Sequence, residues 1–113
     1  MSEQYRLLKI YVGEATKHKG KNSVQLILNL LREHEIAGVT VIRGIMGYGA
    51  DKKMHGTRVL ELSADLPVVL EMIDTAKKIE QVLPKLVEMI PKGLCFSVDV
   101  DVRFGGVLTR KEG

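Results

Sequence analysis

The sequence has no tryptophan, a single cysteine and only 4% aromatic residues. So few aromatic side chains provide no platform on which bases could stack, which argues against a nucleic-acid partner. The one thiol, Cys95, cannot close an internal disulfide, and this cysteine usage favours a cytoplasmic protein. No apolar run approaches the roughly 20 residues that a bilayer span requires, and no apolar signal-peptide core is visible at the N-terminus. Direct membrane insertion is therefore not expected.

Charge of either sign is also modest, since 17 basic and 14 acidic residues leave a formal net charge of +3. A surplus of this size keeps a protein soluble but is too small for the footprint of a nucleic-acid-binding surface. Hydrophobic residues, in contrast, make up 45% of the 113 residues, which is enough for a buried core. We therefore expect one folded domain over residues 1–113, with residues 105–113 as a basic tail.

Hydrophobic periodicity divides the chain into strands and two helices. Short runs rich in β-branched residues predict strands, and strict alternation of apolar and polar residues predicts the last of them. Apolar residues spaced three and four apart predict two amphipathic helices. The extended segments cover residues 5–12, 39–46, 57–62, 67–73 and 95–104, and the helices run from 22 or 23 to about 35 and from 74 or 75 to about 90.

Capping and breaking residues mark the ends of these helices. Gly38 is expected to stop the first helix, because glycine adopts the left-handed conformation without steric cost. Pro84 lies inside the second helix and is expected to kink it. Residues 13–21 and 47–56 are polar and without periodicity, so both are interpreted as loops. The candidate N-terminal caps are Asn22 or Ser23 for the first helix and Asp74 or Thr75 for the second.

The order of these elements is β-α-β-β-α-β, which is the ferredoxin-like plan of the α+β class. In that plan, both helices lie on one face of an antiparallel sheet. The strands at 5–12, 39–46 and 67–73 nevertheless carry apolar side chains on both faces, and two helices can cover only one of them. The second face is therefore expected to pack against other copies of the chain.

Residues that could carry catalysis do not form a recognisable arrangement. Asp99 and Asp101 share one face of a predicted strand, but no third metal ligand accompanies them, and an exposed polar face accounts for both. The three histidines, His18, His34 and His55, have no metal-ligand spacing. We therefore predict no catalytic residue and no metal site, and we do not expect an enzyme.

Two glycine-containing segments were compared with known phosphate-binding motifs. Residues 13–23 join a strand to a helix N-terminus and resemble a phosphate-binding loop, but six residues separate the two glycines where the Walker motif has four. Lys19 or Lys21 beside the helix N-terminus still favours an anion. Residues 44–49 follow a strand as a dinucleotide fingerprint does, yet they lead into another strand instead of a helix.

Several blocks of the sequence are characteristic of one protein family. Residues 37–49 contain Arg-Gly-x-x-Gly-Tyr-Gly, and residues 65–74 begin with Asp-Leu-Pro-Val-Val. Three short pairs accompany them: Gly-Glu at 13–14, Gly-Lys at 20–21 and His-Gly at 55–56. Over nearly its whole length, the chain resembles the PII-like family catalogued as domain of unknown function 190.

This resemblance implies a ferredoxin-like homotrimer related to the PII nitrogen-regulatory signalling proteins, without an established enzymatic activity. PII proteins bind adenine nucleotides in clefts between subunits and present a long loop to protein partners. Genes of the family often lie beside the gene of a fluoride-exporting channel. The implied partner of residues 47–56 is therefore a protein, with a membrane transport protein as a candidate. The implied ligand is an adenine nucleotide or another small anion, and no cofactor is required.

The resemblance and the glycine-containing loops together select the candidate ligand-binding residues. Basic side chains would neutralise an anion, and glycines would let backbone amides approach it. Glu14 is the acidic member, expected to orient Lys21 or Arg43 or to bind a cation that accompanies the ligand. The candidates are Glu14, Lys21, Arg43, Gly44, Gly47, Tyr48, Gly49, His55, Lys92 and Arg103.

We therefore predict a cytoplasmic, trimeric PII-like signalling or sensor protein. It would bind a small anion or a nucleotide between subunits and present a mobile loop, residues 47–56, to a protein partner. In this hypothesis, the ligand selects one conformation of the loop. The alternative is a trimeric protein-interaction module without small-molecule binding.

Overall fold

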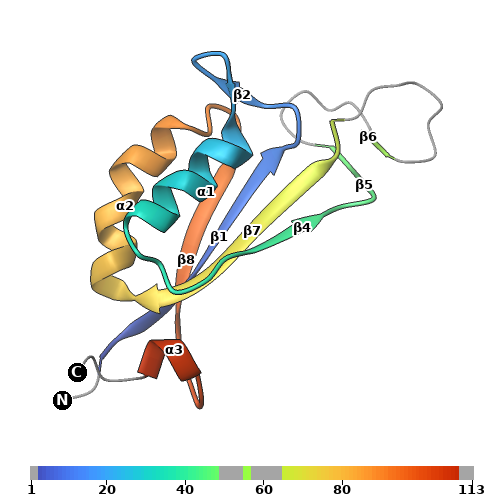
Figure 1. The fold of residues 1–113 in the computed structure, drawn as a ribbon. Helices are drawn as coiled ribbons and strands as arrows, with labels where there is room; N and C mark the ends of the chain where they lie inside the picture. The colour runs from blue at the N-terminus through green and yellow to red at the C-terminus, as the bar shows by residue number, and fades with distance from the viewer. Residues whose placement is uncertain (1–2, 49–54, 57–64, 110–113) are drawn as a thin grey trace.

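The computed structural model describes residues 3–48, 55–56 and 65–109. Four antiparallel strands form the main sheet, in the order β4-β7-β1-β8 (Figure 1). The central strand β1 pairs with β7 along its whole length and with β8 over residues 5–11. The bounds of these strands are Tyr5–Gly13 for β1, Thr40–Arg43 for β4, Pro67–Thr75 for β7 and Leu94–Val100 for β8.

Two helices, α1 (Ser23–Glu33) and α2 (Ala76–Glu88), pack side by side on one face of this sheet (Figure 1). Alternate residues of the central strands point toward the helices and are buried with the apolar stripe of each helix, as Leu8, Leu70 and Ile79 illustrate. This arrangement confirms the predicted ferredoxin-like α+β fold. None of the helices in the described ranges is long and apolar enough to cross a membrane.

Helix α1 begins at a predicted cap but ends at a different residue. The Asn22 Oδ1 accepts a hydrogen bond from the backbone amide three residues later, at 3.0 Å. At the other end Glu35, not Gly38, adopts the left-handed conformation, with a φ of 57°. The Ile36 amide donates to the Leu31 carbonyl at 3.0 Å, as in a Schellman cap. Because Leu31 and Ile36 both belong to the buried core, their burial holds this turn although its left-handed residue is not glycine.

Helix α2 is capped by Thr75, whose Oγ1 accepts a hydrogen bond from the Lys78 amide at 3.2 Å. The other candidate cap, Asp74, lies in β7 and has a buried side chain. The helix continues past Pro84 to Glu88, slightly short of the end predicted near residue 90.

Strand lengths follow the pairing partners and differ from the sequence-based boundaries. β7 continues to Thr75 because it pairs with the whole of β1. β8 ends at Val100, opposite Tyr5, although the alternation of apolar and polar residues continues to residue 104. β4 likewise ends at Arg43, before the predicted boundary at 46. The predicted extended segment at 57–62 lies outside the described residues.

The connection at 13–21, predicted to be an irregular loop, contains a short hairpin. Strand β2 (Lys17–His18) pairs with β3 (Lys21–Asn22) across a two-residue turn. The turn residues Lys19 and Gly20 have φ values of 54° and 80°, as in a type I′ turn, whose twist matches that of hairpin strands.

Two further short elements were not predicted. Strand β5 (Met46–Gly47) pairs with β6 (His55–Gly56), so the segment predicted to be a loop at 47–56 has paired ends. Residues 49–54, on which the predicted mobility of that loop mainly depends, lie outside the described residues. In the predicted tail, Gly106–Thr109 form the short helix α3, and the Tyr5 hydroxyl donates to the Leu108 carbonyl at 3.2 Å.

The face of the sheet opposite the two helices, here called the open face, is mainly apolar. Val98 and Phe96 of β8 lie opposite Leu7 and Lys9 of β1 and are 46% and 39% exposed. Near the middle of this face, the Lys9 Nζ is 3.2 Å from a carboxylate oxygen of Glu71. The pairing assigns to the open face Leu7, Lys9, Tyr11, Ile42, Val69, Glu71, Ile73, Leu94, Phe96 and Val98.

Candidate functional site

A groove of about 680 Å³ opens at the end of the sheet where β1 finishes and where β7 and β8 begin. Its walls come from the end of β1 and the connection that follows it, from β5, from the start of β7, and from the turn between α2 and β8. The lining residues are Tyr11, Val12, Gly13, Ala15, Thr16, Lys17, Gly47, Tyr48, Asp65, Pro67, Val68, Pro91, Lys92, Gly93 and Leu94.

One wall is held in place by Asp65, which precedes β7. Its Oδ1 accepts a hydrogen bond from the Ala15 amide at 2.8 Å, and the Leu66 carbonyl accepts one from the Glu14 amide at 2.8 Å. A Cβ atom added at Gly13 would lie 2.6 Å from the same Asp65 oxygen. Glycine at position 13 therefore allows the two connections to approach each other.

The opposite wall depends on a second close approach, between Gly93 and the end of β1. A Cβ atom at Gly93 would lie 2.3 Å from the Tyr11 carbonyl oxygen, which belongs to the backbone and cannot swing aside. The turn also places Lys92 on the groove. A glycine is thus needed where the turn after α2 meets the sheet.

Glu14 and Arg43 form an ion pair beside the groove. The Arg43 Nη2 is 3.0 Å from one Glu14 carboxylate oxygen and 3.1 Å from the other. The pair connects the segment after β1 with the end of β4, and the next residue, Gly44, donates its amide to the Pro67 carbonyl at 2.7 Å. Of the two basic neighbours expected for Glu14, Lys21 and Arg43, the structure pairs it with Arg43.

The structure brings together only part of the predicted site. Gly47, Tyr48 and Lys92 line the groove, whereas Lys21 lies on strand β3 of the hairpin and is not among the lining residues. The backbone of His55 pairs with Gly47 in the β5–β6 ladder. Gly49 lies outside the described residues.

Arg103 is placed at the opposite end of the sheet from the groove. Strand β8 begins beside the groove and ends at Val100, opposite Tyr5, and Arg103 follows this end. There the Arg103 Nη1 is 3.0 Å from the Asp101 Oδ2, and both side chains are well exposed. Within one subunit, Arg103 therefore does not contribute to the groove.

The groove residues that were not predicted as ligand contacts include Thr16, Lys17 and Asp65. Thr16 and Lys17 belong to the segment whose glycine spacing does not fit a Walker loop. In that segment, proximity to the helix N-terminus selected Lys19 and Lys21 instead. Asp65 was visible at the start of the Asp-Leu-Pro block, but its role depends on the antiparallel pairing of Gly13 with residue 67. Only the pairing of β1 with β7 reveals that contact.

Two lysines give the groove a positive character. Lys17 and Lys92 are exposed on its lining, and neither forms an ion pair within the part of the chain that the structure describes. Asp65 is the acidic side chain among the lining residues, and its Oδ1 is engaged by the Ala15 amide. Two unpaired ammonium groups above closely approaching backbone suit an anionic ligand.

Lys9 and Cys95, whose pKa values are shifted, are not among the groove-lining residues. A hydrogen bond to the Glu71 carboxylate raises the pKa of Lys9. Burial raises the pKa of the Cys95 thiol, and a thiol held in its protonated form is a weak nucleophile. Within the described ranges, no group of three or more His, Cys, Asp or Glu side chains is placed to hold a metal ion.

The chain belongs to the domain of unknown function 190 family, whose model, described as "Uncharacterized ACR, COG1993", matches residues 5–102. It is 38% identical over 101 residues to the UPF0166 protein MJ1524 of Methanocaldococcus jannaschii, and the match covers 88% of this chain and 93% of that protein. The family predicted from the Arg-Gly-x-x-Gly-Tyr-Gly and Asp-Leu-Pro-Val-Val blocks is therefore confirmed.

Solved structures share the fold at low sequence identity. One is CPII, a nitrogen regulatory PII-like protein from Thiomonas intermedia K12 bound to ADP, AMP and bicarbonate, with a TM-score of 0.60, 18% identity and 88% of each chain covered. Another is the divalent ion tolerance protein CutA1 from Ehrlichia chaffeensis, with a TM-score of 0.63, 13% identity, and coverage of 96% of this chain and 92% of that one. The architecture is thus that of PII-like proteins.

Proposed function

We propose that this protein is a PII-like signalling or sensor protein that binds a small anion or a nucleotide in the groove at the end of its sheet. The observation that carries the proposal is the pair of exposed lysines, Lys17 and Lys92, which form no ion pair with another described residue and lie on a groove with closely approaching backbone. A protein of the same fold, CPII, has been solved with ADP, AMP and bicarbonate. That ligand set contains both anion classes that this groove would suit.

The groove offers different chemistry to the two parts of a nucleotide. Lys17 and Lys92 would neutralise phosphate or carboxylate charge. Tyr11, Tyr48 and Pro67 provide flat apolar surface for a ring, and Tyr48 is 65% exposed and so available for stacking. Burial of the ring would favour binding of a nucleotide over binding of a bare inorganic anion, because the inorganic anion would contact only the lysines.

The proposed site is completed by assembly of the chain into a homotrimer. The open face is apolar and would be removed from water by neighbouring copies. Arg103, at the far end of its own sheet, could serve a groove only in another subunit. The predicted grouping of Arg103 with Lys92 therefore requires the inter-subunit site.

The proposal includes a protein partner in the cytoplasm that contacts residues 47–56. Gly47 lies on the groove and pairs with His55, so a ligand in the groove would touch the base of this segment. Ligand binding and partner binding could thereby be coupled, with a coupling energy no greater than the preference of the ligand between two states of the segment.

Titration calorimetry with ADP, AMP, ATP, bicarbonate and inorganic phosphate tests the ligand proposal. For whichever of these binds, Lys92→Gln should weaken affinity by about tenfold, because it removes one charge-assisted contact. Arg43→Ala should weaken it less and leave the protein folded, since its ion pair with Glu14 is partly exposed, with the Arg43 side chain 59% and the Glu14 side chain 34% accessible. Lys85→Gln, on the exposed side of α2, is the matched control and should leave affinity unchanged.

Absence of binding by all five compounds, or equal affinity in Lys92→Gln and wild type, would contradict the groove as a ligand site. A trimeric protein-interaction module would then be favoured. The observation that supports this second candidate is the exposure of apolar side chains after β4, with Ile45 and Met46 75% and 49% exposed.

A further inference from the structure

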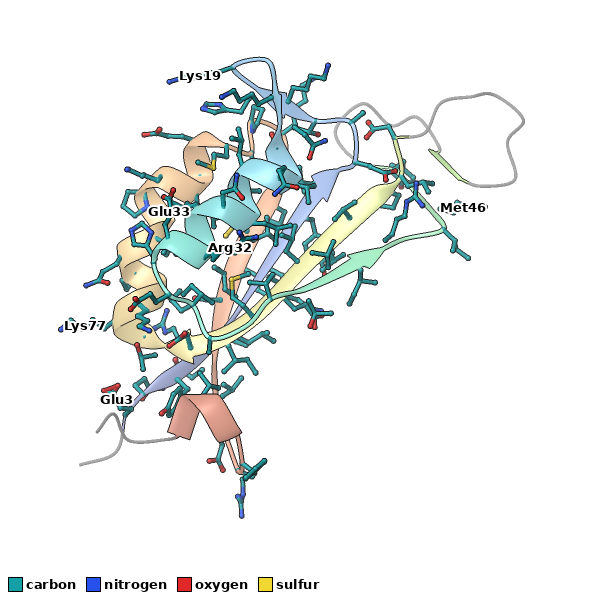
Figure 2. The ribbon with its side chains drawn as sticks, in the orientation of Figure 1. Glu3, Lys19, Arg32, Glu33, Met46 and Lys77 are labelled. Carbon is teal, nitrogen blue, oxygen red and sulfur yellow. The ribbon has the colours of Figure 1, made fainter. Side chains whose placement is uncertain are left out.

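The hairpin formed by β2 and β3, residues 17–22, concentrates positive charge at one end of the molecule. Lys17, Lys19 and Lys21 are exposed and His18 is half-buried, and no acidic residue lies between residues 15 and 22. Figure 2 shows Lys19 at the tip of this projection, at the opposite end of the helical layer from Lys77. None of the three lysines forms an ion pair with another described residue.

The tip carries a lysine at a position where its conformation is unfavourable. Lys19 has a φ of 54°, in the left-handed region that glycine and asparagine adopt most readily. A lysine in this region is strained, and within the described structure its side chain makes no hydrogen bond or ion pair that would compensate. Because no such interaction offsets the backbone strain at Lys19, its side chain is a candidate for a functional contact.

The base of the hairpin is firmly held, so the lysines are presented on a fixed support. The Ser23 amide donates to the Thr16 carbonyl at 2.9 Å, and the Asn22 Nδ2 donates to the Glu14 carbonyl at 3.1 Å. Asn22 also caps α1 through its Oδ1. A partner that binds the hairpin would therefore not have to order its backbone first.

The surroundings reinforce the positive field of the hairpin. The first turn of α1, which follows it directly, contains no acidic residue and adds the positive end of the helix dipole. The nearby Glu14 carboxylate is already paired with Arg43. Among the described residues, therefore, no ion pair neutralises the lysines of the hairpin.

We propose that this basic hairpin is a docking site for an acidic segment of a partner protein. Register places His18 and Lys21 on one face of the hairpin and Lys17 on the other, with Lys19 at the turn. Charges spread in this way cannot converge on one phosphate, but they match carboxylates spaced along an extended chain. The hairpin has no apolar side chain to insert into a bilayer, which favours an acidic peptide over a lipid surface.

This surface is distinct from the proposed ligand site, because Lys19 and Lys21 do not line the groove and only Lys17 belongs to both. The sharpest variant is Lys19→Asn, which removes the charge and places at the turn a residue that favours its conformation. Lys19→Asn should raise the melting temperature and weaken binding of a fluorescein-labelled oligo-glutamate peptide at low salt by about threefold. Lys19→Arg should keep the wild-type affinity.

A charge-matched pair of triple variants tests whether position matters. Lys17→Gln/Lys19→Asn/Lys21→Gln should weaken oligo-glutamate binding by about tenfold or more. Arg32→Gln/Lys77→Gln/Lys85→Gln loses the same charge from exposed helix positions and should change it by less than about twofold. Fluorescence anisotropy measures the affinities, and amide chemical shifts should move at residues 16–22.

Equal losses of oligo-glutamate affinity in the two triple variants would overturn the proposal, because the change in affinity would then follow from net charge alone. An unchanged affinity in Lys19→Asn would overturn it as well. So would hairpin-dependent binding to phosphatidylserine vesicles that is stronger than binding to the peptide, since the partner would then be a membrane. Because Lys19→Asn leaves the groove intact, nucleotide or anion affinity should be unaffected, and failure of either proposal can be distinguished from failure of the other.

Discussion

Asp74 shows how one buried side chain can join two elements that are distant in sequence. It lies near the end of β7 and is only 3% exposed. One carboxylate oxygen accepts the Ala37 amide at 2.8 Å, and the other accepts the Thr75 amide at 2.7 Å. The burial of a carboxylate is unfavourable unless its oxygens are hydrogen-bonded, and here both are. Asp74 thus anchors the connection between α1 and β4 to the end of β7.

Asp74→Ala is expected to destabilise the protein by about 3 kcal/mol, because two backbone amides lose a charged acceptor. Urea unfolding followed by circular dichroism measures the change. Asp99→Ala is the control: Asp99 also belongs to an ion pair, with Arg6 at 3.1 Å, but it is exposed and should contribute about 1 kcal/mol or less. Similar losses of unfolding free energy in the two variants would show that the burial of Asp74 does not determine its contribution to stability.

At the scale of elements, the groove exists because connections approach the sheet more closely than a side chain would permit. The turn between α2 and β8 meets the backbone of β1 at Gly93, and the connection after β1 meets Asp65 at Gly13. Gly38, between α1 and β4, is different: a Cβ atom there would meet nothing within 4 Å. The glycines of this chain therefore have unequal structural roles, although they look alike in the sequence.

Gly93→Ala is expected to lower stability by about 1–3 kcal/mol, because the added methyl group collides with the fixed Tyr11 carbonyl and must displace the turn. The groove would be distorted in the same variant, so binding of any ligand found by calorimetry should also weaken. Gly38→Ala should be neutral or stabilising by up to about 1 kcal/mol, since it restricts the unfolded chain without a clash. Thermal unfolding of both variants tests this contrast, and a Gly93→Ala variant as stable as wild type would contradict it.

At the scale of the whole molecule, the open face sets the expected assembly. Its apolar strand residues surround one ion pair, Lys9 with Glu71 at 3.2 Å. The carboxylate raises the pKa of Lys9 above its ordinary 10.5, so the pair stabilises the folded chain at neutral pH. This contribution is complete below pH 10.5 and is lost as the pH rises through the raised pKa. Subunits that cover the face would enclose the pair.

Light scattering on a sizing column should give three times the 12.6 kDa subunit mass. Lys9→Met should shift the protein toward the monomer, because it leaves the Glu71 carboxylate unpaired in an apolar interface. Lys9→Met/Glu71→Leu should restore the trimer, since neither charge then has to be buried. A monomeric wild type at micromolar concentration would contradict the assembly. A single variant that stays trimeric would show that the pair lies outside the interface.

Much of the fold could be predicted from local sequence patterns, because these patterns reflect interactions between residues that are close together in the sequence. The apolar spacing of α1 and α2 reflects one buried face per helix, and the cap at Asn22 depends on an amide only three residues away. The alternation of apolar residues in β8 likewise revealed a strand. Together with the order of the elements, these signals were sufficient for the ferredoxin-like plan, whereas the family was predicted from the Arg-Gly-x-x-Gly-Tyr-Gly and Asp-Leu-Pro-Val-Val blocks.

The remaining features depend on contacts between residues that are far apart in the sequence. Helix α1 ends at Glu33, and the chain turns at Glu35, because Leu31 and Ile36 are buried against other elements. The position of Gly38 in the sequence could not reveal this. Pairing of β1 with β7 brings Asp65 to Ala15, and pairing with β8 carries Arg103 to the end of the sheet away from the groove. The sequence determined which segments form the four strands of the main sheet and the two helices that cover it, because those choices follow local periodicity. Only the tertiary structure decided which loops share the groove, because strand pairing and core packing set that geometry.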